Sequence, residues 1–284
     1  MAINADDVKR LRRKTGAGIM DCKRALKESN GDFGRAEEIL KELGLAAVAK
    51  LSGRAAKEGR VFAYVGENSA GLMEINCETD FVARNASFIR AGNDLVKTAV
   101  ENSLTMQDAA CTDIISELAA TLKENIALGR METIKIADNQ LAFRYIHGDS
   151  GNPGVLIVLE LSPMKKDEAV LTLGKDLAMH AAAFNPLYLN PEAVDASYMK
   201  DQEKIFRTQA EQMDKPPNVT EGIIKGKMRK HLKEICFTEQ GFVKDEKRSV
   251  AQVLKDTSKD VGVEITLTYY RVFRVGESLS EWGE

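Results

Sequence analysis

The sequence predicts an α+β fold: an N-terminal three-helix bundle, a core of two repeated hairpin-plus-helix subdomains, and a protruding helical hairpin. Three observations support this prediction. Residues 4–44 contain three short amphipathic segments separated by glycine-containing turns. The middle of the chain repeats an ordered set of residues at an offset of 81–83 positions. Two long helical segments then meet at the proline-rich turn 215–218, which is typical of two antiparallel helices.

The N-terminal bundle is predicted from helix caps and hydrophobic spacing. Asn4 can cap a first helix, whose opening turn carries two aspartates that suit the helix dipole. The turn Thr15–Gly18 separates this helix from a second one over residues 19–29. A third helix follows and is expected to end at Gly44, and residues 45–59 are expected to form a helical linker.

The charge distribution sets this bundle apart from the rest of the chain. The 284 residues are 44% hydrophobic and 29% charged, and the net charge of −3 gives no general electrostatic case for nucleic-acid binding. Residues 1–57, however, hold 13 Lys and Arg against 8 Asp and Glu. A basic module on an acidic body predicts a partner that is an acidic protein surface or RNA, unless the charges form only a solvated helix face.

Two strands and two helices follow the bundle, and then the pattern returns. The strands are expected at residues 61–65 and 72–77, and the helices at about 86–100 and 113–126. Four pairs of segments match in the same order: Phe62–Val65 with Phe143–Ile146, Asn68-Ser69 with Asp149-Ser150, Gly71 with Gly154, and Gly92–Leu95 with Gly174–Leu177. The middle of the chain is therefore predicted to be two copies of one unit.

The two copies differ most between the second strand and the helix. The first copy has Thr79-Asp80-Phe81-Val82 there, whereas the second has the polar connection 161–168. Spacing alone favours a structural role, in which Thr79 or Asp80 caps the helix and Phe81 packs back onto the unit. The alternative is that Phe81 faces solvent as a binding residue.

A helical insertion follows the second copy. Pro191 is expected to open a helix over residues 193–213, and residues 219–234 are expected to return. The basic side chains of the returning helix have no interleaved aromatic residues, which favours a solvated or protein-binding face over RNA. A short helix over 249–256 precedes a strand over 263–275, which is expected at an edge of the second sheet.

Motifs for covalent catalysis, cofactors and metals are not found in the sequence. There is no P-loop, so direct nucleotide binding is not expected. The four cysteines are too widely spaced for a zinc site or a disulfide framework, and His147, His180 and His231 form no local metal motif. His180 is expected to be a buried, hydrogen-bonded histidine. A hydrolase that pairs Cys77 with His147 stays open only by assumption.

The sequence also gives no signal for secretion or membrane insertion. Residues 1–7 lack a basic start followed by an apolar stretch, and no apolar run approaches the roughly 20 residues of a membrane span. We therefore expect a cytoplasmic protein that needs no cofactor and no membrane.

Five segments, in order along nearly the whole chain, resemble the signatures of one family. They are Leu11–Leu26, Asn76–Asn85, Tyr145–His147, Met179–Ala183 with Pro186, and Thr238–Val243. The family is elongation factor Ts, the nucleotide-exchange factors of elongation factor Tu. One departure is Gly241, which stands where the family usually has proline.

The resemblance implies a domain organisation. Residues 1–54 resemble the family's ubiquitin-associated-like domain, and residues 55–140 resemble core subdomain N. Core subdomain C would combine residues 141–186 and 235–276, and residues 277–284 would form a short tail. Residues 187–234 resemble the family's coiled-coil dimerisation arm, so the arm either pairs with a second copy or packs on its own core.

The resemblance also implies a partner and a site. In the family, the segment that matches Thr79, Asp80, Phe81 and Val82 enters the GTPase domain of elongation factor Tu near the nucleotide's magnesium. This protein is then expected to promote GDP release without covalent chemistry, and to bind no specific nucleic acid. Further partner contacts are expected at Leu11, Thr15, Gly16, Ala17, Gly18, Met20, Lys23 and His147. The rival function is an RNA- or ribosome-associated module that uses the basic bundle.

Overall fold

The computed structural model describes residues 4–213 and 215–277 and has the predicted α+β fold. The chain divides into two compact units. Residues 4–134, 148–153 and 273–277 belong to the first unit, and residues 135–147 and 154–272 belong to the second. The predicted division into a bundle, two core subdomains and an arm is finer than this and stays a prediction. Apart from residue 277, the predicted C-terminal tail lies outside the described residues.

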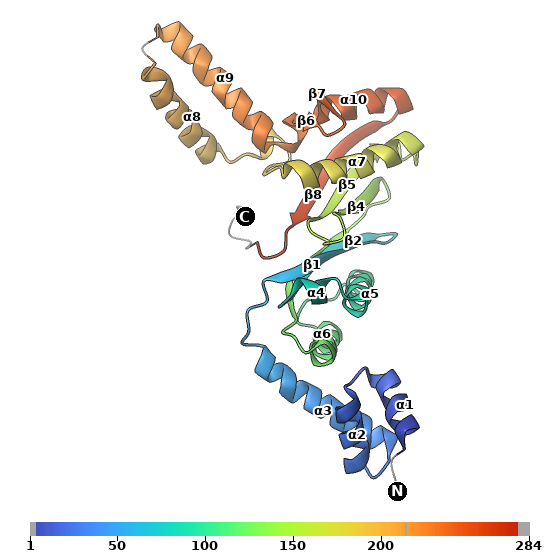
Figure 1. Ribbon diagram of the computed structural model, residues 1–284. Helices are drawn as coiled ribbons and strands as arrows, with labels where there is room; N and C mark the ends of the chain where they lie inside the picture. The colour runs from blue at the N-terminus through green and yellow to red at the C-terminus, as the bar shows by residue number, and fades with distance from the viewer. Residues whose placement is uncertain (1–3, 214, 278–284) are drawn as a thin grey trace. The chain divides into compact units, whose positions relative to one another are not determined.

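Three helices form the N-terminal bundle of the first unit (Figure 1). They are α1 (Ala5–Thr15), α2 (Ile19–Glu28) and α3 (Phe33–Leu51). The predicted cap is confirmed, because the Asn4 side chain accepts a hydrogen bond of 2.7 Å from the Asp7 amide. Gly16 ends α1 with a φ of 69°, which a residue with a side chain rarely adopts. Leu11, Cys22 and Leu26 are fully buried between the helices.

The prediction that the third helix ends at Gly44 is wrong, because α3 continues to Leu51. Gly44 lies within the helix, and a Cβ placed there would come 3.0 Å from the Cβ of Ala120. Glycine at this position therefore permits the close approach of α6 (Ala109–Leu122) rather than a change of backbone direction. Ala-rich residues after Gly44 favour continuation of the helix. The expected linker is helical only as far as residue 51.

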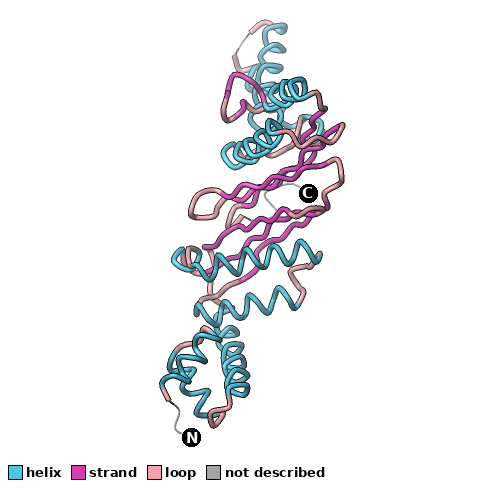
Figure 2. Tube along the Cα trace, turned by 90° about the vertical axis from the view of Figure 1, so that its right-hand side faces the viewer, coloured by secondary structure: helices cyan, strands magenta, loops and turns pink. Residues whose placement is uncertain are grey.

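The rest of the first unit is built on a three-stranded sheet. Its strands, in the order β1-β2-β3, are β1 (Glu58–Val65), β2 (Ser69–Cys77) and β3 (Ala127–Lys135). The antiparallel register of β1 and β2 places Phe62 opposite Met73. Helix α5 (Ala86–Asn102) covers one face of the sheet, and α6 packs against α5 on the side away from the strands (Figure 2). Phe88 and Leu95 of α5 are fully buried in the resulting core.

The second unit repeats the arrangement of a sheet covered by a helix. Its sheet has the order β4-β5-β8, from β4 (Gln140–Ile146), β5 (Gly154–Ser162) and β8 (Glu264–Phe273). The last strand lies at the edge of the second sheet, as predicted. Helix α7 (Glu168–Phe184) packs on β4 and β5, and α10 (Val250–Val261) packs on α7. The α10 helix is longer than predicted, because the left-handed Gly262 and not residue 256 ends it.

The predicted helical hairpin is present in the second unit. Helices α8 (Ala196–Glu211) and α9 (Pro217–Ile235) pack along each other. Pro191 opens only a short 3-10 turn, and α8 starts later, where Asp195 accepts hydrogen bonds from the first turn. A small hairpin of β6 (Gly241–Phe242) and β7 (Asp245–Ser249), which was not predicted, follows the arm. No described helix is both long and apolar enough to cross a membrane.

The internal repeat has a packing explanation. In the first unit, a Cβ built on Gly92 of α5 would lie 2.2 Å from the ring of Phe62 on β1. In the second unit, a Cβ built on Gly174 of α7 would lie 2.4 Å from the ring of Phe143 on β4. Each unit therefore seats a phenylalanine of its first strand against a helix glycine. Two of the four sequence matches are the two halves of this single contact.

The contact between phenylalanine and glycine predicts how replacing the glycine changes stability. Replacing Gly92 or Gly174 with alanine is expected to destabilise its unit by about 1–3 kcal/mol, because the ring has no room to move in a packed core. Gly222 in α9 is a matched control, since nothing lies within 4 Å of its would-be Cβ. Gly222→Ala is expected to stabilise the helix by about 0.5–1 kcal/mol. Urea unfolding of the three variants measures both signs, and equal shifts would contradict the explanation.

Candidate functional site

The segment Thr79–Val82 forms the start of a one-turn helix, α4 (Asp80–Ala83), directly after β2. The predicted cap is present, because the Thr79 hydroxyl accepts a hydrogen bond of 3.3 Å from the Val82 amide. The packing of Phe81 onto the unit, which spacing alone favours, is wrong, because 82% of this side chain is exposed, as the alternative expects. Val82 packs against the core of the unit in its place, and Ala83 is buried. The turn is thus anchored by Val82 and Ala83, while Phe81 faces solvent.

Glu124 holds the N-terminal end of this turn. Its carboxylate accepts hydrogen bonds of 3.0 Å from the amides of Glu78 and Thr79, and one of 2.6 Å from the Thr79 hydroxyl. Lys123, which precedes it, ends α6 in a left-handed conformation with a φ of 62°. The helix predicted to extend to residue 126 therefore ends early, because residues 124 and 125 turn away to bond the segment after β2.

Arg60 of β1 holds the C-terminal end. This arginine is buried, and its guanidinium donates to the carbonyl of Ala83, the last residue of α4, at 3.4 Å. It also donates to the carbonyl of Asp149 in the loop 148–153. That loop is close-packed on the arginine, since a Cβ built on Gly151 would lie 2.5 Å from the Arg60 Nε. A cation at the end of a helix is favourable to the exposed carbonyl groups there.

The surface around Phe81 is charged. Asp80 and Arg84 pair across one helical turn at 3.4 Å, but both side chains are at least half exposed. Such a pair contributes little to stability and can be broken readily by a partner. Arg54 lies 3.4 Å from the Glu78 carboxylate, whose side chain is only 20% exposed. An exposed aromatic ring among carboxylates and arginines is suited to recognition by another protein.

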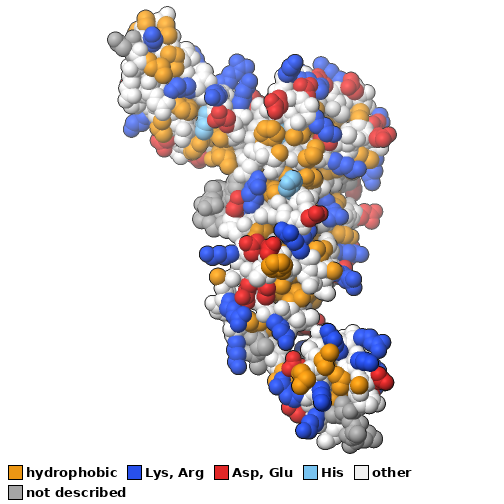
Figure 3. Space-filling model, in the orientation of Figure 1, with side chains coloured by type: hydrophobic (Ala, Val, Ile, Leu, Met, Phe, Trp, Pro, Cys, Tyr) orange, Lys and Arg blue, Asp and Glu red, His pale blue; other side chains and the backbone are white. Residues whose placement is uncertain are grey.

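The predicted contacts of the bundle have different environments. Met20 is 73% exposed and the neighbouring Ile19 is 53% exposed, and Lys23 is exposed on the same helix. Figure 3 shows apolar side chains interleaved with Lys and Arg on the visible face of the bundle. Leu11 is fully buried, so its side chain is part of the bundle core instead of its surface.

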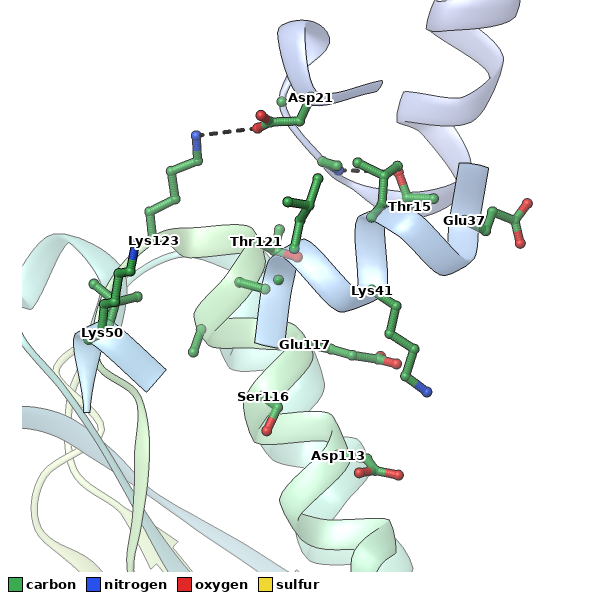
Figure 4. Close-up of a pocket in the computed structure, with 18 of the residues that line it drawn as sticks. Thr15, Asp21, Glu37, Lys41, Lys50, Asp113, Ser116, Glu117, Thr121 and Lys123 are labelled. Atoms are coloured by element: carbon green, nitrogen blue, oxygen red, sulfur yellow. Dashed lines mark hydrogen bonds and ion pairs between the residues drawn. The ribbon is translucent and has the colours of Figure 1, made fainter. Parts of the chain in front are cut away.

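The turn Thr15–Gly18 faces a neighbouring helix of the first unit. Thr15 bonds its own turn, with its hydroxyl donating to the Leu11 carbonyl at 2.9 Å. A Cβ on Gly16 would contact the Thr121 side chain at 3.3 Å, and Lys123 lies 4.0 Å from Asp21. Between the bundle and α6 lies a cleft of about 770 Å³ (Figure 4). Acidic and basic side chains both line it, including Lys41, Lys50, Asp113 and Glu117. The lining therefore favours neither an anionic nor a cationic ligand.

The Cys77 thiol is unsuited to nucleophilic catalysis. It is fully buried, and burial raises the pKa of Cys77 to about 12. The protonated thiol donates to the Thr79 carbonyl at 3.2 Å. Because the thiolate is the nucleophile, the hydrolase hypothesis that was built on Cys77 has no chemical basis here. His147 is exposed at the end of β4, where its Nδ1 lies 3.0 Å from the Tyr145 hydroxyl.

Other cysteines and carboxylates offer no alternative site. All four cysteines, Cys22, Cys77, Cys111 and Cys236, are buried and free. Among residues 4–213 and 215–277, no three His, Cys, Asp or Glu side chains are grouped as metal ligands would be.

Glu124 and Arg60 were not found from the sequence. Glu124 is 45 residues from Thr79, and no motif links the two positions. Arg60 gave a weak signal, because it is a charged residue at the start of an apolar strand. Its hydrogen-bond partners are backbone carbonyl groups, which carry no sequence information.

Comparisons with known proteins agree with the resemblance described above. A family model described as "Elongation factor TS" matches residues 78–277, which is more than half of the chain. A relative from Borrelia hermsii (strain HS1 / DAH), named "Elongation factor Ts", is 45% identical over 278 residues, covering 97% of this chain and 100% of its own length. Proteins of the same name from Treponema denticola and Borreliella burgdorferi are 45% and 41% identical, and cover 97% and 96% of this chain and 99% of their own lengths.

Proposed function

Because the chain belongs to the elongation factor Ts family, we propose that it promotes GDP release from elongation factor Tu by inserting Asp80 and Phe81 beside the nucleotide's magnesium. The observation that supports this proposal most is the exposure of Phe81 on a turn whose two ends are held by buried or half-buried side chains. The factor would act through binding alone and form no covalent intermediate.

The energetic basis of exchange is the difference in binding between two states of the partner. A factor that weakens nucleotide binding must itself be weakened by nucleotide to the same degree. Phe81 supplies such a difference if it finds an apolar pocket only in the partner whose nucleotide site has opened. Burying the ring there would contribute about 2 kcal/mol, enough for roughly a thirtyfold change in an equilibrium or a rate.

Asp80 would act beside the ring by electrostatics. Its carboxylate is half exposed and pairs with the exposed Arg84, so it can turn toward a new cation or a metal-bound water at little cost. A carboxylate near the water ligands of magnesium competes for their hydrogen bonds. Asp80 and Phe81 are adjacent in α4, so one insertion brings both groups to the partner.

Replacing Phe81 with alanine tests the proposal. We expect GDP release from elongation factor Tu to slow by roughly ten- to thirtyfold at saturating factor, because the apolar contact is lost. Release of a fluorescent GDP analogue in stopped flow measures this rate. The melting temperature should not change, because the ring makes almost no contacts within the chain.

A matched control separates this effect from a general loss of surface hydrophobicity. Leu171 on α7 is also an exposed apolar residue, at 38%, and lies in the second unit away from the turn in sequence. With the Leu171→Ala variant, elongation factor Tu is expected to release GDP as fast as with the unaltered protein. Equal rates for Phe81→Ala and the unaltered protein would refute the insertion of Phe81.

A further inference from the structure

We propose that Glu124 is a positioning residue for nucleotide exchange, because its carboxylate holds Thr79 in the conformation that caps α4 and directs Phe81 outward. The inference rests on the function proposed above and adds to it a residue that never needs to touch the partner. Glu124 belongs to the segment between α6 and β3, far from the turn in sequence.

The turn that carries Phe81 cannot hold its own shape. Helix α4 has four residues, whereas isolated helices shorter than about 12 residues are marginal in water. Its backbone conformation must therefore be imposed by contacts from outside. Packing of Val82 and Ala83 fixes one side of the turn, but it leaves the amide groups at the N-terminal end without helical partners.

The hydrogen bonds of Thr79 leave a single arrangement for its hydroxyl. The oxygen accepts from the Val82 amide, and its one hydrogen is then available to a single acceptor, the Glu124 carboxylate at 2.6 Å. Glu124 thereby orients the hydroxyl that caps the helix. The same carboxylate also accepts hydrogen bonds from the amides of Glu78 and Thr79, so three donors at one end of α4 bond to it. An ionised carboxylate suits this position because it only accepts.

Hydrogen bonds run in both directions between the segment after β2 and the segment after α6. While the Glu124 carboxylate accepts from the backbone after β2, the Glu78 carboxylate accepts from the Asn125 amide at 2.7 Å. The Asn125 side chain also donates to the Arg54 carbonyl at 2.6 Å, which ties the same segment to the entry of β1. The bonds to the Glu124 and Glu78 carboxylates are charge-assisted, and they fix direction as well as distance. With Arg60 bonded to the Ala83 carbonyl, the turn is restrained at both ends.

Two variants and a control test the role of Glu124. Glu124→Ala removes all three acceptor contacts, and Glu124→Gln keeps the shape but replaces one acceptor oxygen with a donor group. The control is Glu117→Ala, which removes an exposed glutamate from α6 itself. Amide hydrogen exchange at Val82, followed by NMR, reports the capped state directly. GDP release from elongation factor Tu is measured over a range of factor concentrations.

We expect Glu124→Ala to expose the Val82 amide to exchange and to lower the maximal rate of GDP release by about tenfold. The half-saturating concentration should change much less, because the rest of the surface is intact. The maximal rate of Glu124→Gln should lie between those of Glu124→Ala and the unaltered protein. Glu117→Ala should match the unaltered protein in both measurements.

A double variant decides whether Glu124 acts through Phe81. If it does, Glu124→Ala slows release no further once Phe81 is already alanine. A full additional loss in the Phe81→Ala background would overturn the positioning role, as would a normal rate or a protected Val82 amide in Glu124→Ala alone. A normal rate for Phe81→Ala would instead overturn the function proposed for the turn, and with it any role of Glu124 in exchange.

Discussion

Replacing Arg130 with methionine is expected to destabilise the first unit by about 3–5 kcal/mol, because it leaves the Glu74 carboxylate buried without its counter-charge. The two side chains are 9% and 3% exposed, and the Arg130 Nε lies 2.7 Å from a Glu74 carboxylate oxygen. Glu74→Gln is expected to have a loss of similar size, since the guanidinium then stays buried without an anion. Urea unfolding monitored by circular dichroism measures both losses.

The size of this effect follows from how fully the pair is enclosed. The second oxygen of Glu74 accepts hydrogen bonds of 2.8 Å from the Asn76 side chain and the Gly276 amide. Arg130 donates to the Arg274 carbonyl, and its guanidinium stacks 4.5 Å from the centre of the Phe273 ring. The pair therefore fixes residues 273–277 within the first unit, so hydrogen exchange in that segment should accelerate in either variant.

A double replacement distinguishes an unpaired charge from lost packing. Changing Glu74 to leucine and Arg130 to methionine together removes both charges and keeps much of the apolar volume. Buried ion pairs replaced in this way are often neutral in stability. We expect the double variant to be more stable than either single variant. Additive losses would show that the pair contributes through packing and that the charges matter little.

The second unit is expected to lose stability as the pH falls below neutrality, because His180 is buried in its neutral form. Burial lowers the pKa of His180 from 6.5 to about 4, and the bond to Gln240 only partly opposes this. The unfolded chain therefore takes up a proton in this range that the folded unit does not. The free energy of unfolding is therefore unaffected by His180 above roughly pH 6.5. Below that pH it falls by about 1.4 kcal/mol per pH unit, and the loss reaches about 3 kcal/mol near pH 4.

The hydrogen bonds of the ring explain why it stays neutral. The Nδ1 atom accepts from the Val243 amide at 3.1 Å, so the single ring hydrogen lies on Nε2 and donates to the Gln240 side chain at 3.0 Å. A second proton would place two donors against each other at Nδ1. Phe184 and Phe237 stack on the ring at 4.6 and 5.2 Å between centres, which excludes water. The sequence-based expectation of a buried, hydrogen-bonded histidine is thus confirmed.

Urea unfolding between roughly pH 7 and pH 5 measures this effect, since most carboxylates titrate at lower pH. Hydrogen bonds lower the pKa of Asp167, Asp195 and Asp245, so these aspartates contribute to the loss of stability only below that window. Gln is the test replacement at His180, because it does not titrate. The His180→Gln variant should be less stable at pH 7 but should lose most of the pH dependence. An unchanged slope in this variant would show that another group is responsible.

Local sequence determined much of the fold. The cap at Asn4, the glycine turn after α1 and the proline turn of the arm could be predicted because each depends on neighbouring residues. The repeat could also be predicted, since one packing contact, phenylalanine on glycine, is written twice. The family signatures then identified Thr79–Val82 as the candidate site and elongation factor Tu as the expected partner.

The tertiary structure decided how that segment is presented. Spacing alone favoured Phe81 packed inward, yet Val82 takes the inward position and Phe81 is exposed. Gly44 looked like a helix end, whereas it is a point of close contact with α6. Glu124 holds the candidate turn across 45 residues of sequence by accepting backbone amides. Every residue but proline offers such an amide, so these bonds leave no pattern in the sequence, and only folding brings the carboxylate to them.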